Sequence, residues 1–150
     1  MKNNETNFPH LEEASLPRKY RGDPRAKAEA LGMTLVYPKA DEIFIDLDSQ
    51  EELEEHHLRW EFFCAVFPGA ERRFTKSRNG NVHVYITLPF LIEAVERIAL
   101  EACLGGDYRR QMILVSDFRE SFTQSTSLFF EFPGTIPSSE IPTIDRPAEV

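Results

Sequence analysis

The stretch EIFIDLD, residues 42–48, alternates apolar and polar positions and thereby predicts a β-strand with one buried face. Successive side chains of a strand point to opposite sides of the sheet, so the residues separate into two sets. Facing one side are Ile43, Ile45 and Leu47, and facing the other are Phe44, Asp46 and Asp48. The first set predicts a core, and the second places two carboxylates on the same side of one strand.

A second alternating stretch, VHVYITL at residues 82–88, predicts a partner strand. Its apolar side consists of Val82, Val84 and Ile86, and its other side of His83, Tyr85 and Thr87. The segment ERRFTKS, residues 71–77, predicts a third strand that a turn at SRNGN, residues 77–81, joins to the second. SLFFEFP, residues 127–133, predicts a last strand that ends at its proline.

Helices are predicted between these strands. Ser49 is a typical N-cap, and the helix that follows it ends at Pro68 and Gly69. The predicted buried stripe of this helix is Leu53, His57, Trp60, Cys64 and Phe67. Pro89 is expected to open a second helix. Its stripe would be Leu91, Val95, Ile98 and Ala102. QMILVSDF, residues 111–118, fits a strand or a helical turn, and we favour the helix.

The order strand, helix, strand, strand, helix, strand predicts an α+β fold of the ferredoxin-like or RRM-like βαββαβ type. In this fold both helices cover one face of an antiparallel sheet, and the first and third strands are adjacent at its centre. A helix ended by Gly32 and the strand MTLVYP, residues 33–38, precede it. We expect one domain over residues 25–133, a flexible arm at 1–24 and a proline-rich flexible tail at 134–150.

Composition narrows the class of protein. The chain has 150 residues, 41% of them hydrophobic, which is enough for one core. Its formal net charge of −8 argues against wrapping a polyanion through many Lys and Arg contacts. Cys64 and Cys103 lack a metal-binding spacing and are expected to be buried free thiols. Without an apolar signal segment or a membrane-spanning run, we expect a cytoplasmic protein.

Strand parity brings several polar and aromatic groups together on the face without helices. They are Phe44, Asp46, Asp48, His83 and Tyr85. Asp46 and Asp48 are two residues apart along one strand, about 6.6 Å. Such carboxylates suit divalent cations, for which a substrate's phosphate oxygens supply further ligands. A DxD ahead of a helix is also common without a metal, because either residue is able to cap that helix.

The IFIDLD strand, followed by the Ser-x-His-like element SRNGNVHV, resembles the catalytic core of archaeo-eukaryotic primases and primase-polymerases. The resemblance covers about residues 41–131. The same segments also resemble small phage-encoded proteins of unassigned activity. The resemblance implies nucleotide or nucleic-acid binding, a role in DNA replication and, if the site is active, metal-dependent nucleotidyl transfer.

Residue roles follow from the resemblance at the matching positions. Asp46 and Asp48 correspond to the ligands of Mg²⁺ or Mn²⁺, and His83 to the contact with the phosphates of the incoming nucleotide. A third acid completes the metal site in that family. Glu131 is the preferred candidate here and Asp117 the alternative.

Further residues are candidates for nucleic-acid contact. Phe44 and Tyr85 would stack bases as in RNA-recognition modules, would pack beneath the strand at residues 33–38 or a tail, or would form a dimer patch. Ser77 belongs to the Ser-x-His-like element. The basic residues that would steer a phosphate, or simply protect an edge strand from pairing, are Arg72, Arg73, Lys76 and Arg78.

The alternative function is a non-catalytic RRM-like module that binds a protein partner through its acidic surface or its tails. Its small size, its net charge and the lack of a template-gripping region favour this alternative. A row of acids, Glu51, Glu52, Glu54 and Glu55, also raises the possibility of a nucleic-acid mimic, but a solvated helix face explains it as well.

Overall fold

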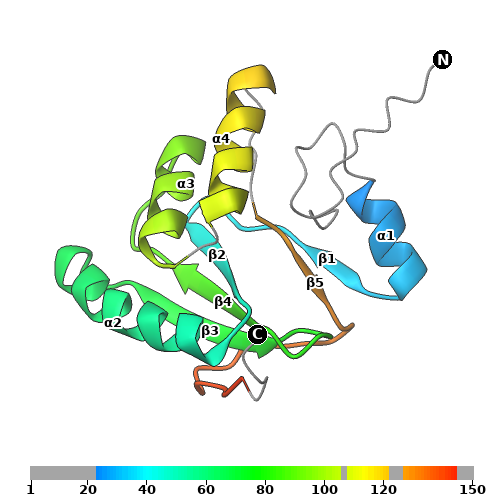
Figure 1. Ribbon diagram of the computed structural model, residues 1–150, viewed down its shortest axis with the longest axis horizontal. Helices are drawn as coiled ribbons and strands as arrows, with labels where there is room; N and C mark the ends of the chain where they lie inside the picture. Colours follow the sequence, from blue (N-terminus) through cyan, green and yellow to red (C-terminus); the bar gives the residue numbers. More distant parts are fainter. Residues whose placement is uncertain (1–22, 106–107, 122–126, 145–150) are drawn as a thin grey trace.

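The computed structural model describes residues 23–105, 108–121 and 127–144 (Figure 1). Its helices are α1 (Pro24–Leu31), α2 (Gln50–Val66), α3 (Ala94–Cys103) and α4 (Tyr108–Ser121). Its strands are β1 (Thr34–Val36), β2 (Glu42–Leu47), β3 (Glu71–Lys76), β4 (Val82–Thr87) and β5 (Phe129–Glu131). The predicted α+β class is confirmed, including the βαββαβ order, the leading helix and strand, and the helix at residues 111–118. Within the described residues, no helix is long and apolar enough to cross a membrane.

The central sheet has three antiparallel strands in the order β2, β4, β3. The β2–β4 register pairs Ile43 with Ile86, Ile45 with Val84, and Leu47 with Val82. All six of these side chains are at most 1% exposed and belong to one core cluster. The parity that the sequence predicts is therefore confirmed, and α2 and α3 lie on this face of the sheet (Figure 1).

The last strand lies elsewhere than the sequence suggests. In a βαββαβ sheet β5 would extend the sheet beside β2, but here it pairs with β1 in a separate antiparallel ribbon. Phe129 of β5 stacks on Phe44, with ring centroids 4.6 Å apart, and on His83, at 3.9 Å. The aromatic side chains on the second face of the sheet thus draw β5 over that face, because burying them removes a large apolar area from water.

Helix α3 begins later than predicted. Residues 88–93 form a loop that is fixed by hydrogen bonds from Leu88 N to Asp41 O and from Ile92 N to Ala40 O. Glu93 is the N-cap residue and forms a capping box with Glu96. The buried residues of α3 are Ala94, Arg97, Ile98 and Glu101. Of the predicted stripe only Ile98 is buried, whereas Leu91, Val95 and Ala102 are exposed.

The buried face of α2 is rotated slightly from the prediction. Ser49 is the N-cap as expected, and its Oγ accepts a hydrogen bond from Glu52 N. His56, not His57, is fully buried, and it contacts Leu104 O through Nδ1 at 2.8 Å. Burial lowers the pKa of His56 to about 4. Hydrophobic periodicity does not distinguish two adjacent histidines, so this backbone contact decides which one enters the core.

Part of the predicted tail belongs to the domain. Ser138 pairs with Phe74 on the free edge of β3, and Ile144 is 3% exposed within the main core cluster. Ile144 N also donates to Gln50 Oε1 at 2.8 Å. The boundary expected at residue 133 is therefore too early for residues 134–144, which cover a strand edge. The predicted flexible segments at residues 1–22 and 145–150 lie outside the described residues.

This attachment yields a stability prediction. Replacing Ile144 by Ala removes a buried branched side chain, so we expect a loss of about 2–5 kcal/mol in the free energy of unfolding. The matched control is Ile136→Ala, since Ile136 lies in the same segment and is 84% exposed. Chemical denaturation of both variants tests the difference, and equal midpoints would show that Ile144 does not contribute to the core.

Glu101 is a buried acid at the junction of α3, α4 and the approach to β5. It is 0% exposed, and its Oε2 accepts hydrogen bonds from Gln111 Nε2 at 3.4 Å and Ser127 Oγ at 3.3 Å. Burial raises the pKa of Glu101 to about 7. The folded chain thus holds this proton at pH values where the unfolded chain has lost it. The contribution of Glu101 to stability therefore decreases as pH rises from about 4.5 to about 7.

A Glu101→Gln variant should remove this dependence. We expect the stability of the variant relative to wild type to increase by on the order of 2–3 kcal/mol from about pH 5 to about pH 8. Urea denaturation at several pH values measures it. Glu29→Gln is the control, because Glu29 is exposed on α1. A constant difference between Glu101→Gln and wild type would contradict the buried, protonated state.

Candidate functional site

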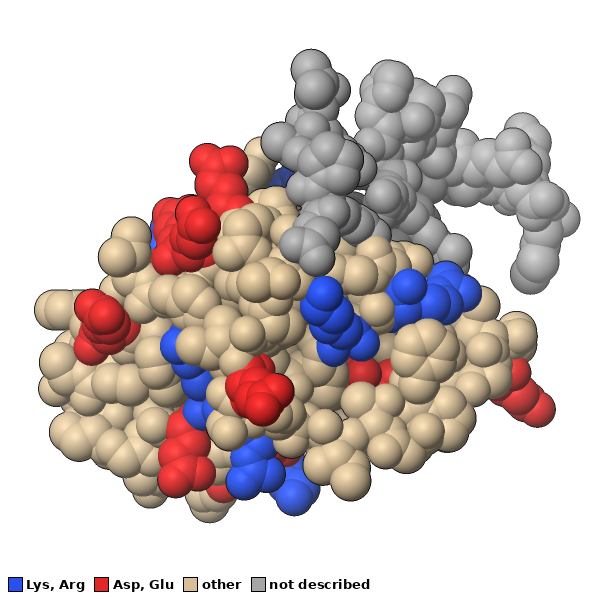
Figure 2. Space-filling view, turned by 90° about the horizontal axis from the view of Figure 1, so that it is seen from below, with Lys and Arg blue, Asp and Glu red and all other residues tan. Residues whose placement is uncertain are grey.

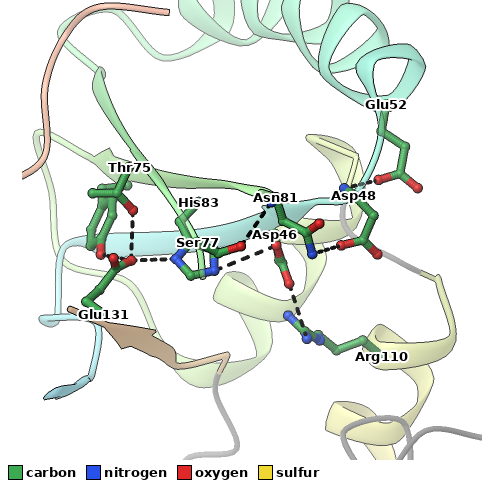
Figure 3. A network of polar contacts seen from close by, with 10 residues as sticks. Asp46, Asp48, Glu52, Thr75, Ser77, Asn81, His83, Arg110 and Glu131 are labelled. Atoms are coloured by element: carbon green, nitrogen blue, oxygen red, sulfur yellow. Dashed lines mark hydrogen bonds and ion pairs between the residues drawn. The ribbon is translucent and has the colours of Figure 1, made fainter. Parts of the chain in front are cut away.

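The candidate site is formed where β2 and β4 pair. Asp46 and His83 are direct cross-strand partners, and both face away from α2 and α3. His83 Nε2 lies 3.8 Å from Asp46 Oδ1, and His83 Nδ1 is in hydrogen-bond contact with Glu131 Oε1. Figure 3 shows the imidazole between the two carboxylates. Three of the residues that the primase resemblance implies are therefore neighbours.

Glu131 is held from three directions. Its Oε1 accepts hydrogen bonds from Thr75 Oγ1 at 2.8 Å and Tyr85 OH at 2.7 Å, in addition to the contact with His83. Burial alone would raise the pKa of Glu131, but the hydrogen bonds from His83, Tyr85 and Thr75 outweigh burial and lower this pKa. Burial and the bond to Glu131 raise the pKa of Tyr85. Glu131 is thus a carboxylate that anchors β5 to the sheet.

Asp46 lies at the solvent side of this network. Its side chain is 22% exposed, and Oδ2 lies 3.9 Å from Arg110 Nη2 of α4. Oδ1 is buried and has no hydrogen-bond partner among the described residues. Both neighbours, Arg110 Nη2 and His83 Nε2, are beyond hydrogen-bond distance, a spacing at which a bridging group is commonly found. The sequence did not predict Arg110 as a site residue, because no local pattern indicates that α4 approaches β2.

Asp48 follows the end of β2 and is exposed. Asn81 Nδ2 donates to its Oδ1 at 2.6 Å, and Asn81 N donates to Ser77 Oγ at 3.0 Å. Ser77 therefore stabilises the turn between β3 and β4, which in turn positions Asn81 beside the two aspartates (Figure 3). Asn81 Oδ1 is another buried oxygen without a hydrogen-bond partner among the described residues. Asn81, like Arg110, was missed by sequence reasoning.

The predicted base-stacking residues are buried. Phe44 is 1% exposed and Tyr85 is 8% exposed, and both pack with Phe129 and Val36 in a second core cluster. Of the possibilities that the sequence leaves open, packing beneath the strand at residues 33–38 is the one observed. Stacking on bases would require the β1–β5 ribbon to leave the sheet.

The predicted basic cluster is divided between two faces. Arg72 lies toward the helices, its guanidinium 5.0 Å from the ring centroid of Trp60 and 5.2 Å from that of Phe74. Arg73, next along β3, faces the other side beside Tyr85, while Lys76 and Arg78 are exposed. Figure 2 shows basic and acidic side chains interspersed on the face seen from below. These four residues therefore do not form one phosphate-binding surface.

The oxygen atoms near Asp46 determine which metal ion the site would bind. In the described part of the chain, no three His, Cys, Asp or Glu side chains gather as a metal site. Glu131 Oε1 is engaged with Thr75, Tyr85 and His83, and Oε2 is buried without a hydrogen-bond partner among the described residues. Asp117 is buried two helical turns from Arg110, about 10 Å along α4. The candidate oxygen ligands nearer to solvent are those of Asp46, Asp48 and Asn81. Hard oxygen donors of this kind fit Mg²⁺ or Mn²⁺ when a ligand supplies further oxygens.

The chain matches no protein-family model, no curated protein and no solved structure. The resemblance to primases therefore rests on the two sequence motifs alone.

The Glu131 network yields a prediction. Tyr85→Phe deletes one donor to a buried carboxylate, so we expect a loss of about 1–3 kcal/mol in the free energy of unfolding. The matched control is Tyr37→Phe, which deletes the same hydroxyl from a residue that is 48% exposed, and its effect should stay within about 0.5 kcal/mol. Thermal or urea denaturation of both variants measures this. A neutral Tyr85→Phe would argue that Glu131 does not depend on this bond.

Proposed function

We propose that this chain is a primase-like nucleotide-binding domain that holds the phosphates of a nucleotide, together with Mg²⁺ or Mn²⁺, at the end of β2. The supporting observation is Asp46, whose buried Oδ1 lacks a hydrogen-bond partner while Arg110 Nη2 and His83 Nε2 lie 3.9 and 3.8 Å from its carboxylate. A buried carboxylate oxygen without a hydrogen-bond partner is unfavourable unless a further group binds it.

Asp46 and Asp48 would hold the divalent cation, with Asn81 beside them. When bound, such a cation polarises phosphoryl oxygens and offsets the charge of both carboxylates. Arg110 is the phosphate contact in this proposal. Its side chain is 31% exposed, and its guanidinium presents several donors to an oxyanion. It replaces the basic cluster on β3 in that role.

His83 acts as a positioning residue in this proposal. Its side chain is 8% exposed, and the contact of Nδ1 with Glu131 fixes the orientation of the ring. Nε2 is thereby directed at Asp46. A carboxylate bound to one ring nitrogen of a histidine fixes the ring orientation and the direction of the other nitrogen. Direct contact with a phosphate, which the resemblance implies, would require the β1–β5 ribbon to move.

The proposed ligand is a nucleotide and not an extended template. The aromatic side chains that would stack bases are covered by Phe129. The net charge of −8 also disfavours long contacts with a polyanion. A compact site that needs only a few oxygens and one arginine agrees with both observations.

Calorimetric titration of ATP in the presence and absence of Mn²⁺ tests this proposal. We expect the wild type to bind ATP only with Mn²⁺, and Asp46→Asn/Asp48→Asn to lose this binding. Arg110→Gln should weaken it by about tenfold to a hundredfold, because one charge-assisted contact is removed.

The control is the double variant Glu71→Gln/Glu140→Gln, which removes two charges from exposed positions and should bind as wild type does. Absence of ATP binding by the folded wild type at about 1 mM with Mn²⁺ would reject the proposal. An equal loss of ATP binding in the control variant would show that binding depends on the net charge of the chain and not on Asp46 and Asp48.

A further inference from the structure

The outward face of α2 carries an apolar stripe. Leu58, Phe62 and Val66 are spaced by four residues and therefore lie along one side of the helix. They are 73%, 75% and 51% exposed, respectively. The opposite side of α2 supplies Leu53, His56 and Phe63 to the interior. The fold of the domain does not explain the stripe, since these three side chains contribute little to the core.

Acidic residues adjoin the stripe. On a helical projection Glu51 and Glu55 continue the line of Leu58 and Phe62 toward the N-terminus of α2, and Glu54 and Glu61 flank one side. All four are exposed. Arg59 borders the other side, where it pairs with Glu55 and reaches carbonyl oxygens at the end of α3. The face is therefore negatively charged over its first half and apolar over its second half, where Glu61 borders the apolar row.

We propose that this face of α2 is a docking surface for an amphipathic helix that presents apolar side chains at intervals of three or four residues beside Lys or Arg. The periodic row of Leu58, Phe62 and Val66 matches the anchor spacing of helix recognition. The surrounding glutamates select a basic partner through charge complementarity. A second copy of this chain is disfavoured as the occupant, because it would bring another acidic face of the same kind.

The proposal is independent of the nucleotide site. Asp46 and Arg110 lie on the opposite side of the sheet from α2, since Asp46 faces away from the helix-covered core. The variant Asp46→Asn/Asp48→Asn should therefore bind a helical partner as wild type does. Failure of one proposal leaves the other unchanged.

The test uses a synthetic helical peptide of about 18 residues, long enough to cover α2, with a leucine stripe and lysine at the remaining positions. A second peptide carries glutamate in place of lysine. Fluorescence anisotropy with the full chain should show binding of the lysine peptide that weakens with salt, and none of the glutamate peptide. Leu58→Ser/Phe62→Ser should reduce the affinity at least about tenfold.

The matched control is Met112→Ser/Val115→Ser on α4, which removes two apolar side chains that are 67% and 46% exposed. It should retain wild-type affinity. Equal loss in both double variants, or equal binding of both peptides, would overturn the assignment. Sedimentation of the chain alone should show a monomer, and a dimer that Phe62→Ser dissociates would identify a second copy as the occupant instead.

Discussion

The carboxylate of Glu131 fixes the position of β5, and this position determines which face of the central sheet is accessible. A buried charge is tolerated only when hydrogen bonds replace its hydration, and here Thr75 and Tyr85 donate to the oxygen that His83 also contacts. Because these donors come from β3 and β4, β5 lies across the sheet instead of extending it. The face that RRM-like folds leave open is therefore covered, and the accessible polar groups lie at its rim.

The sequence predicts β2 and β4 well because the alternation of apolar and polar residues lies within each strand. The alternation over residues 42–48 and 82–88 indicates which side chains of β2 and β4 face the helices, and the observed pairing agrees with it. The position of β5 depends instead on a three-residue strand and on contacts with residues about 50 positions away. The predicted buried face of α3 was wrong because two charged residues, Arg97 and Glu101, are buried, and hydrophobic periodicity does not predict buried charged residues. Arg97 is held there by the carbonyl oxygens of Lys39 and Glu42.

The same difference between local patterns and long-range contacts explains which residues of the candidate site were predictable. Asp46 and His83 were predictable as neighbours, since parity alone places them together on adjacent strands. Arg110 and Asn81 were not, because the first depends on the packing of α4 and the second on a turn that Ser77 stabilises. Glu131 was predicted as a site residue, but its place beside β2 was wrong. It contacts His83 and not the two aspartates, so it supports the site without adding a ligand oxygen to it.

The acidic start of α2 connects the two proposed binding surfaces. A helix N-terminus attracts anions, yet Glu51 and Glu52 occupy the first turn of α2, immediately after Asp48. Their negative charge opposes an incoming phosphate, and Glu52 is already engaged with Asp48 N at 2.7 Å. A basic helix on the outer face of α2 would offset Glu51, Glu54 and Glu55 within about one Debye length of the first turn. This offset acts at the first turn of α2, while the apolar row of the docking surface does not overlap Asp46, which lies on the other side of the sheet.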